Sequence, residues 1–340
     1  MKSLFPLLIY FFSTLISFPV MAQKPVHVIF DTDMGNDIDD ALALAMIHAL
    51  ESRGEAKLLA VTLTKDNKFA APYVDVVNTF YGRGNIPIGV VKNGITKEDS
   101  KMIQVPVEAK KADGSSLFPH DLKDGTQAPE AVGLLRQVLS QEEDGSVVII
   151  QVGFSTNLAR LLDSSPDDHS SLNGKELVKR KVRLLSIMAG EFPSGPPEYN
   201  VREDIASAKK VFYEWPTLVV ASGYEIGKSI LYPAYSIENH FKYVENHPVV
   251  LAYKNYQEMP YDRPTWDLTS VLFAIRPDEG YLGFSEKGKI MVDEQGKTSL
   301  QPEITGNHHY LTVNEIQRKQ VLEALMLLSS QPPGSMSNDQ

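Results

Sequence analysis

Short apolar runs alternate with segments of helical periodicity along most of this 340-residue chain. The runs with the length and composition of strands are 26–30, 57–64, 86–91, 147–152, 182–188 and 217–222. Apolar residues recur at helical spacing over 71–81, 129–141, 157–163, 204–214, 237–259, 266–275 and 313–329. This alternation predicts an α/β fold with an open, mainly parallel, Rossmann-like sheet and helices on both faces. We expect residues 97–125 to form a long loop and residues 280–311 a small β-meander.

The first 22 residues have the pattern of a signal peptide. Lys2 precedes an apolar stretch over residues 4–20, and the triplet Val20-Met21-Ala22 has small residues where a signal peptidase reads. A membrane anchor is the alternative, but polar residues and a proline interrupt the stretch. We therefore expect export to the periplasm or the extracellular medium, with no membrane attachment after residues 1–22 are removed.

Size and composition limit the organisation of the remaining chain. Residues 23–332 suffice for a single large domain, and residues 333–340, rich in Ser, Asn and Gly, predict a disordered tail. The chain has no cysteine, so its stability cannot depend on disulfides. It carries 33 basic and 43 acidic residues and shows no basic stripe, which argues against a nucleic-acid polymer as partner and leaves small molecules open.

The richest chemistry lies in the segment Asp31-Thr-Asp-Met-Gly-Asn-Asp-Ile-Asp-Asp40, which follows the first predicted strand and opens the first predicted helix. Five carboxylates so close together resist joint ionisation unless a cation lies among them. Gly35 permits a sharp turn between strand and helix. Because many hard oxygen ligands suit Ca²⁺ or Mg²⁺ better than zinc, we expect a calcium site at the carboxyl end of this strand.

Two other motifs begin in a similar way. An EF-hand loop needs its glycine at the sixth position and no preceding strand, whereas Gly35 occupies the fifth position counted from Asp31. A haloacid dehalogenase-type phosphatase also begins Asp-x-Asp, but it expects Thr or Val where this chain has Gly35. That interpretation would also leave Asp39 and Asp40 without a role.

Four segments together resemble the inosine-uridine-preferring nucleoside hydrolases, which split the N-glycosidic bond of ribonucleosides with a tightly held Ca²⁺. The acidic segment, continuing into Ala-Leu-Ala-Leu, is similar to the family's N-terminal signature. In the family's order there follow Val152-Gly-Phe-Ser-Thr-Asn157, Glu198-Tyr-Asn200 with Asp204, and Trp266-Asp267 at the start of a helix. The resemblance covers nearly all of the chain after the signal peptide.

The resemblance implies a role for each matching residue. Asp33, Asp40, the backbone carbonyl of Val152 and Asp267 would bind calcium, and Asp33 would also activate a metal-bound water. The ribose hydroxyls would be held by Asp39, Asn67, Glu198 and Asn200, with Asn36 as a further contact and Asp31 in support. Members of the family commonly form dimers or tetramers, so the resemblance also implies a homo-oligomer.

Several residues depart from the family pattern. Two more residues than usual separate Gly35 from Asp39, so Asp37 could replace or join a metal ligand. Trp266 stands where many members have a leaving-group histidine; one purine-preferring branch has Trp there, which suggests that it stacks on a purine. His120 is a candidate leaving-group acid, although a single loop histidine is more often simply exposed. We expect the adjacent His308 and His309 to be surface residues rather than a metal site.

Three functions remain open at this stage. The first is a Ca²⁺-dependent ribonucleoside hydrolase with a purine preference. The second is a hydrolase of the same fold that acts on another ribosyl or glycosidic substrate. The third is a non-catalytic protein that binds sugar or calcium; the presence of Asp33 argues against it, since a binder has no need of a water-activating carboxylate.

Overall fold

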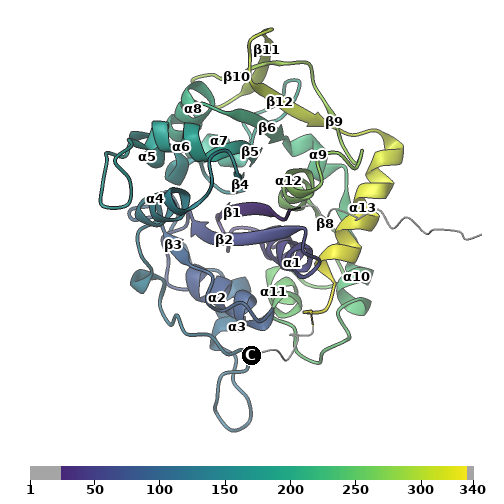
Figure 1. The fold of residues 1–340 in the computed structure, drawn as a ribbon. Helices are drawn as coiled ribbons and strands as arrows, with labels where there is room; N and C mark the ends of the chain where they lie inside the picture. The colour runs from purple at the N-terminus through teal and green to yellow at the C-terminus, as the bar shows by residue number, and fades with distance from the viewer. Residues whose placement is uncertain (1–23, 335–340) are drawn as a thin grey trace, which may run out of the picture.

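The computed structural model describes residues 24–334, in which one large twisted sheet lies between helices (Figure 1). Its strand order is β11-β10-β12-β6-β5-β4-β1-β2-β3, with β9 paired to β12. The strands are β1 (Val26–Thr32), β2 (Ala56–Leu63), β3 (Ile88–Val90), β4 (Val147–Gln151), β5 (Val182–Met188), β6 (Leu218–Ser222), β9 (Gly283–Phe284), β10 (Gly288–Val292), β11 (Thr298–Pro302) and β12 (His308–Thr312). A separate pair joins β7 (Leu231–Tyr232) to β8 (Arg263–Pro264).

The large sheet is parallel from β3 to β12, and its antiparallel pairs lie at the end formed by β9, β10, β11 and β12. The chain starts in the middle at β1, moves outward through β2 to β3, and then returns to β4 on the other side of β1. The strand order therefore reverses between β1 and β4. Ligands of open α/β sheets bind at the carboxyl ends of the strands beside such a reversal.

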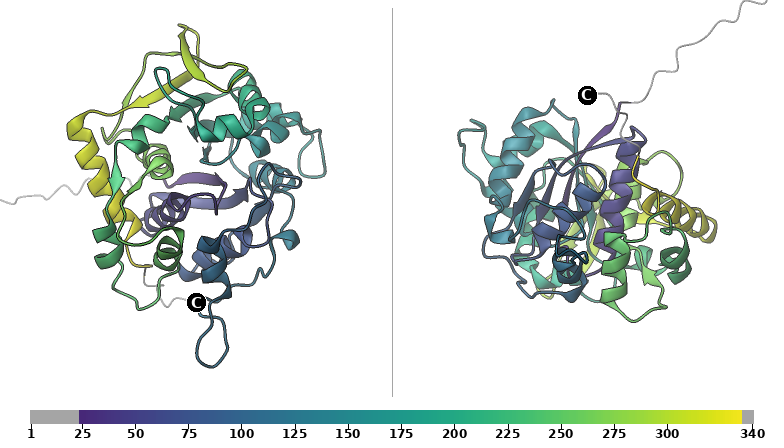
Figure 2. Two further views of the ribbon diagram at one scale, coloured as in Figure 1. Left: turned by 180° about the vertical axis from the view of Figure 1, so that it is seen from behind. Right: turned by 90° about the horizontal axis from the view of Figure 1, so that it is seen from below.

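Helices cover both faces of the sheet (Figures 1 and 2). One layer contains α4, α5, α6 and α8, and the other contains α1, α2 and α12 with α3, α11 and α13 packed outside them. The helices are α1 (Asp39–Ser52), α2 (Ala70–Phe80), α3 (Lys101–Glu108), α4 (Ala131–Gln141), α5 (Thr156–Asp163), α6 (Gly174–Lys181), α7 (Tyr199–Glu203), α8 (Ile205–Glu214), α9 (Tyr224–Lys228), α10 (Ala234–Asn239), α11 (Pro248–Tyr256), α12 (Trp266–Ile275) and α13 (Glu315–Ser329), with a 3-10 turn η1 (Gly125–Gln127).

The alternation of side chains along β1 divides the core into two parts. Val28 and Phe30 belong to the apolar cluster that includes α1 and α12, whereas Ile29 belongs to the cluster that includes α4, α5 and α8. Helix α1 is buried over its first twelve residues, because other elements pack around it on several sides. Burial on both faces explains why the central strands are nearly all apolar.

The predicted fold class is confirmed, and all six predicted strands are present. Three expectations were wrong in detail. Residues 237–259 do not form one helix: α10 ends at Asn239 and α11 begins at Pro248, since proline lacks an N–H and disfavours a helical residue before it. Residues 97–125 are not all loop, because α3 buries Met102, Ile103 and Val107 despite an internal proline. Residues 280–311 form the expected short strands, but these are not a meander: β10 lies between β11 and β12, and β9 pairs with β12, so consecutive strands are neighbours only at β10 and β11 among these four.

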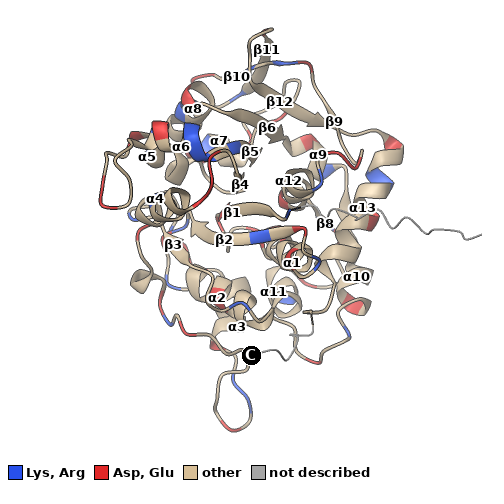
Figure 3. Ribbon diagram, viewed as in Figure 1, with Lys and Arg blue, Asp and Glu red and all other residues tan. Residues whose placement is uncertain are grey.

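The predicted signal peptide, residues 1–22, lies outside the described residues, as does most of the predicted tail, 333–340. In the part of the chain that is described, no helix combines the length and the apolar character needed to cross a bilayer. Acidic and basic residues are interspersed over the elements (Figure 3).

Candidate active site

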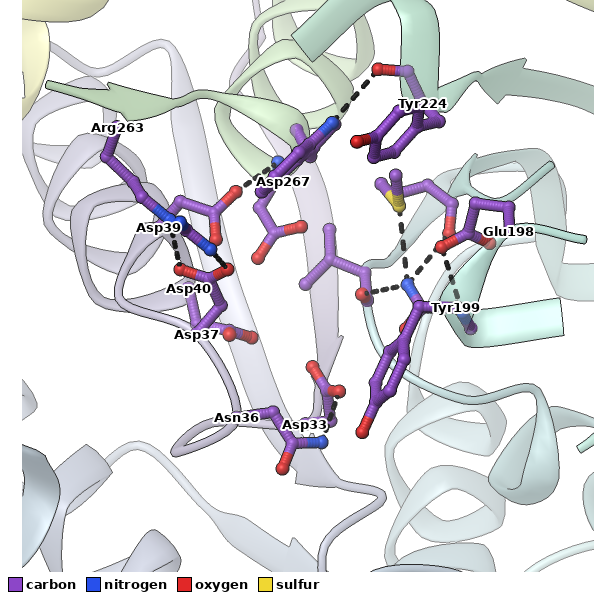
Figure 4. A pocket seen from close by; sticks show the side chains of 14 residues that line it. Asp33, Asn36, Asp37, Asp39, Asp40, Glu198, Tyr199, Tyr224, Arg263 and Asp267 are labelled. Carbon is purple, nitrogen blue, oxygen red and sulfur yellow. Dashed lines mark hydrogen bonds and ion pairs between the residues drawn. The ribbon is translucent and has the colours of Figure 1, made fainter. Parts of the chain in front are cut away.

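The acidic segment lies at the reversal between β1 and β4 and lines a pocket of about 340 Å³ (Figure 4). Its wall is completed by the residue after β4, the start of α7, the start of α9 and the start of α12. The lining residues are Asp33, Asn36, Asp37, Asp39, Asp40, Val152, Met188, Glu198, Tyr199, Asn200, Tyr224, Arg263, Trp266 and Asp267. The structure thus brings ten of the eleven predicted site residues into one pocket, with Asn67 outside it.

Among the described residues, three carboxylates in this pocket form no ion pair with a positively charged side chain. Asp39, Asp40 and Asp267 each offer an oxygen within 4.8 Å of the others, and all three are buried. Burial first, and then neighbouring carboxylates, raise the pKa of each well above its usual value. One oxygen of Asp40 has no hydrogen-bond partner among residues 24–334. Three such groups ionise together only with a cation among them, and hard oxygen donors fit Ca²⁺ or Mg²⁺.

Asp31 and Asp37 have their own partners. Asp31, beneath the pocket, accepts hydrogen bonds from Thr62 at 2.6 Å and from Asn157 at 2.8 Å. Burial nonetheless raises the pKa of Asp31 to about 7, against the effect of these bonds. Asp37 forms a two-pronged ion pair with Arg263, whose Nε lies 2.9 Å from the carboxylate. The arginine therefore occupies Asp37, which lowers its availability as a metal ligand.

Asp33 faces the same pocket and is 5% exposed. Its Oδ2 accepts a hydrogen bond of 2.7 Å from the side chain of Asn36. Burial raises the pKa of Asp33 to about 6, while the hydrogen bond from Asn36 and the charge of Lys65 oppose the rise. A carboxylate with a pKa near neutrality is suited to accept a proton.

The start of α7 forms the opposite wall (Figure 4). Glu198 is the N-cap of this helix and accepts backbone hydrogen bonds from Asn200 at 2.9 Å and from Gly190 at 3.1 Å. Burial raises the pKa of Glu198 to about 7 despite these bonds. The side chain of Asn200 donates to the carbonyl of Val152 at 2.8 Å. Hydrogen bonds therefore link the two predicted ribose contacts, Glu198 and Asn200, to the predicted metal ligand Val152.

An aromatic pair forms another wall. The rings of Trp266 and Tyr224 stack with their centroids 5.3 Å apart and 20° between their planes. The indole N–H of Trp266 donates to the carbonyl of Tyr224 at 2.9 Å. The guanidinium of Arg263 lies 5.2 Å from the Trp266 ring centroid. These contacts hold the indole in place and occupy its N–H, so Trp266 contributes an apolar surface to the pocket rather than a proton donor.

Asn67, His120 and His308 do not line this pocket. The amide oxygen of Asn67 accepts from the backbone N–H groups of Phe69 at 3.0 Å and Ala70 at 2.8 Å, and so caps the start of α2. His120 bonds the carbonyl of Phe118 at 2.8 Å and lines a different cavity. His308 is buried, so the expectation of a surface residue was wrong there, because β12 pairs inside the sheet.

Sequence reasoning did not identify Met188, Tyr199, Tyr224 or Arg263 as pocket residues. Tyr199 could have been found, since it lies between Glu198 and Asn200. Arg263, three residues before Trp266, lies in a two-residue strand that shows no periodicity. Tyr224 is far from every motif in the sequence and reaches the site only because α9 packs on α12.

Comparison with known proteins identifies the family of this chain. A family model described as inosine-uridine preferring nucleoside hydrolase matches residues 28–322. The chain belongs to this family, so the class of enzyme it represents is a hydrolase of the N-glycosidic bond of ribonucleosides.

The relatives differ in the substrates that their names record. Pyrimidine-specific ribonucleoside hydrolase RihA of Klebsiella pneumoniae is 27% identical over 316 residues, which cover 84% of this chain and 92% of the relative. The inosine-uridine preferring nucleoside hydrolase of Bacillus anthracis has a TM-score of 0.66 at 16% identity, covering 89% of this chain and 99% of that one. The purine-preferring ribonucleoside hydrolase of Gardnerella vaginalis has a TM-score of 0.66 at 15% identity, covering 91% and 99%. The two structural likenesses show the shared fold.

Proposed function

We propose that this protein is an exported, Ca²⁺-dependent ribonucleoside hydrolase with a preference for purine nucleosides. The observation that carries the proposal is one pocket that contains the buried carboxylates of Asp39, Asp40 and Asp267 together with Asp33. Family membership supports the reaction class. The ion, the base preference and the role of each residue are our inference from the residues that line the pocket.

The donor set fits a hard divalent cation. Asp40 and Asp267 are candidate ligands because they are buried and lack a cationic partner, and one oxygen of Asp40 has no hydrogen-bond partner in the described chain. Asp33 and the carbonyl of Val152 line the same pocket. Asp39 belongs geometrically to the carboxylate triad, so it could share in binding the cation as well as a ribose hydroxyl. A bound Ca²⁺ would neutralise these carboxylates, orient a water molecule and lower its pKa.

Asp33 is the candidate general base. Nucleoside hydrolysis develops positive charge on the ribose ring as the bond to the base breaks, and water attacks the ring carbon. Asp33 would accept the proton of that water, and the surrounding carboxylates would stabilise the positive charge on the sugar. Glu198, Asn200 and Asn36 would hold the ribose hydroxyls that orient the ring.

The aromatic wall supports the purine preference. The stacked pair of Trp266 and Tyr224 presents a broad apolar surface beside the carboxylates, and flat purine rings gain more from such contacts than smaller pyrimidines. The indole N–H of Trp266 already donates a hydrogen bond to the backbone carbonyl of Tyr224, so it is not available to the departing base. Trp266 would instead assist departure of the base by stacking against it.

Export and assembly complete the proposal. The pattern of residues 1–22 supports secretion to the periplasm or the medium, and the family resemblance supports a homo-oligomer. Mass determination of the exported protein would locate the cleavage site, and light scattering would give the oligomeric state.

The direct test is release of free ribose from inosine, adenosine, guanosine, uridine and cytidine, with and without a calcium chelator. We expect ribose from the purine nucleosides, loss of activity with chelator, and recovery on adding back Ca²⁺. Faster hydrolysis of uridine and cytidine would overturn the purine preference alone. Absence of ribose from all five would point to another ribosyl substrate or to a binding protein.

A further inference from the structure

Lys65, two residues after β2, is buried behind the acidic segment, and its side chain is 2% exposed. Its ammonium donates a 2.8 Å hydrogen bond to the side-chain oxygen of Asn36. The side-chain nitrogen of Asn36 in turn donates a 2.7 Å hydrogen bond to Oδ2 of Asp33. A continuous chain of donors therefore runs from a buried lysine to the candidate general base.

The second contact of Lys65 does not explain its burial. Glu98 lies 3.7 Å away, but its side chain is 79% exposed, and such solvated ion pairs contribute little. Burying an ammonium is costly unless it is well paired. The short contact with Asn36, together with the negative charge of Asp33 beyond it, is the interaction that accounts for a lysine at this position.

Lys65 decides which way the amide of Asn36 faces. An ammonium has only donors, so it accepts only the oxygen end of the amide as its partner. The nitrogen end is thereby directed to Asp33, where it donates to the carboxylate. Without the ammonium, the amide is free to turn its oxygen toward Asp33 and repel it.

The turn that carries Asn36 is packed against the lysine. Gly35 has φ of +110°, a conformation that strongly favours glycine. A Cβ on Gly35 would lie 2.7 Å from the side chain of Ile103 and 3.7 Å from Cδ of Lys65. The backbone therefore cannot move away from Lys65 without opening this packing, which keeps Asn36 in reach.

We propose that Lys65 is a positioning residue that acts through Asn36 to fix the orientation of the Asp33 carboxylate. One oxygen of Asp33 is thereby committed to Asn36, and the other remains for the attacking water. The inference rests on the proposed function only in taking Asp33 as the general base.

Lys65→Met tests the proposal, since methionine keeps most of the aliphatic length and removes the donor. We expect crystals of the metal-free variant to show the Asn36 amide turned and the Asp33 carboxylate displaced. On nucleosides, we expect kcat to fall about 10- to 100-fold with little change in KM, because misplacement of a reacting group acts on the chemical step. Lys68→Met is the control, as Lys68 is exposed three residues away, and it should behave as the parent protein.

Asn36→Asp is the second variant and serves if Lys65→Met does not fold. It still accepts from Lys65 but cannot donate to Asp33, so it should lower kcat similarly. Since both changes act on one contact, the double variant should lose no more than the more impaired single variant. Unchanged positions of Asn36 and Asp33 in the Lys65→Met crystals, or additive losses of kcat, would overturn the proposal. If the parent protein releases no ribose, the proposed function fails, while the crystals still decide the positioning role.

Discussion

Arg263 forms an ion pair with Asp37 across 226 positions of sequence, with the arginine Nε 2.9 Å from the carboxylate. The two side chains are only 18% and 23% exposed. In this pair, the positive charge of Arg263 balances one carboxylate of the acidic cluster, that of Asp37. In the part of the chain that the structure describes, Asp39, Asp40 and Asp267 have no such cation, which is why a bound metal is expected among them rather than at Asp37.

Removing the arginine should therefore destabilise the protein. Arg263→Met leaves Asp37 partly buried without a partner and next to other carboxylates, which should cost roughly 1–3 kcal/mol. The double variant Arg263→Met/Asp37→Asn should recover much of this loss, because the unpaired charge is gone. Urea unfolding in metal-free buffer measures both. A double variant less stable than Arg263→Met would contradict the explanation.

Calcium should stabilise the folded protein through the carboxylate triad. At a calcium concentration 100 times Kd, a single site adds about 2.7 kcal/mol to the free energy of unfolding. Thermal unfolding with added Ca²⁺ or with chelator should show this as a higher Tm with the metal. Asp40→Asn and Asp267→Asn should each abolish most of the shift, whereas the exposed Asp168→Asn should retain it. An undiminished shift in Asp267→Asn would place the metal elsewhere.

Asp33→Ala should abolish turnover. Loss of a general base typically costs a factor of about 100 to 10,000 in rate, and Asp33 is in addition a candidate metal ligand. Ribose release measures the loss, and Asp113→Ala, in an exposed loop, is the matched control. A variant that retains most of its turnover would exclude Asp33 as the base.

The contribution of Asp31 to stability in metal-free buffer should fall as pH rises from about 4 to about 7. Burial raises the pKa of Asp31 to about 7 from its ordinary 3.8, so ionisation of Asp31 is less favourable in the folded protein than in the unfolded chain. Its contribution is fully present below pH 3.8 and is lost as pH approaches 7. Asp31→Asn should reduce this loss, because the amide keeps an acceptor for Thr62 and carries no charge. Thermal melts of both proteins between pH 4 and 8 provide the measurement, and parallel curves would contradict the prediction.

Trp266→Ala should weaken the binding of purine nucleosides more than that of pyrimidine nucleosides. Loss of the aromatic surface removes on the order of 1 kcal/mol of contact with a flat base, which corresponds to a roughly five- to tenfold rise in KM. Trp266→Phe should lose less, since it keeps a ring beside Tyr224 while losing the hydrogen bond to the Tyr224 carbonyl. KM values for inosine and uridine measure the difference. Equal increases for the two nucleosides would show that the ring does not select the base.

Local pattern alone was enough to predict the parallel strands, because central strands buried on both faces must be apolar over their whole length. The local pattern also identified the carboxylates between Asp31 and Asp40 as a functional candidate, because clustering charges at the end of a buried strand costs free energy that a purely structural role does not recover. Two features were harder to predict from the sequence. The break before Pro248 depends on that single proline, and in the helix 101–108 a proline interrupts the apolar stripe.

The sequence determined that this chain folds as an α/β sheet and carries a cluster of carboxylates at the end of its first strand. Only the tertiary structure decided which carboxylates have partners, because Arg263 reaches Asp37 from a remote segment, and Lys65, from the end of another strand, contacts the Asn36 side chain that donates to Asp33. Charge pairing depends on distances of a few ångströms between segments far apart in sequence, and no local pattern contains those distances.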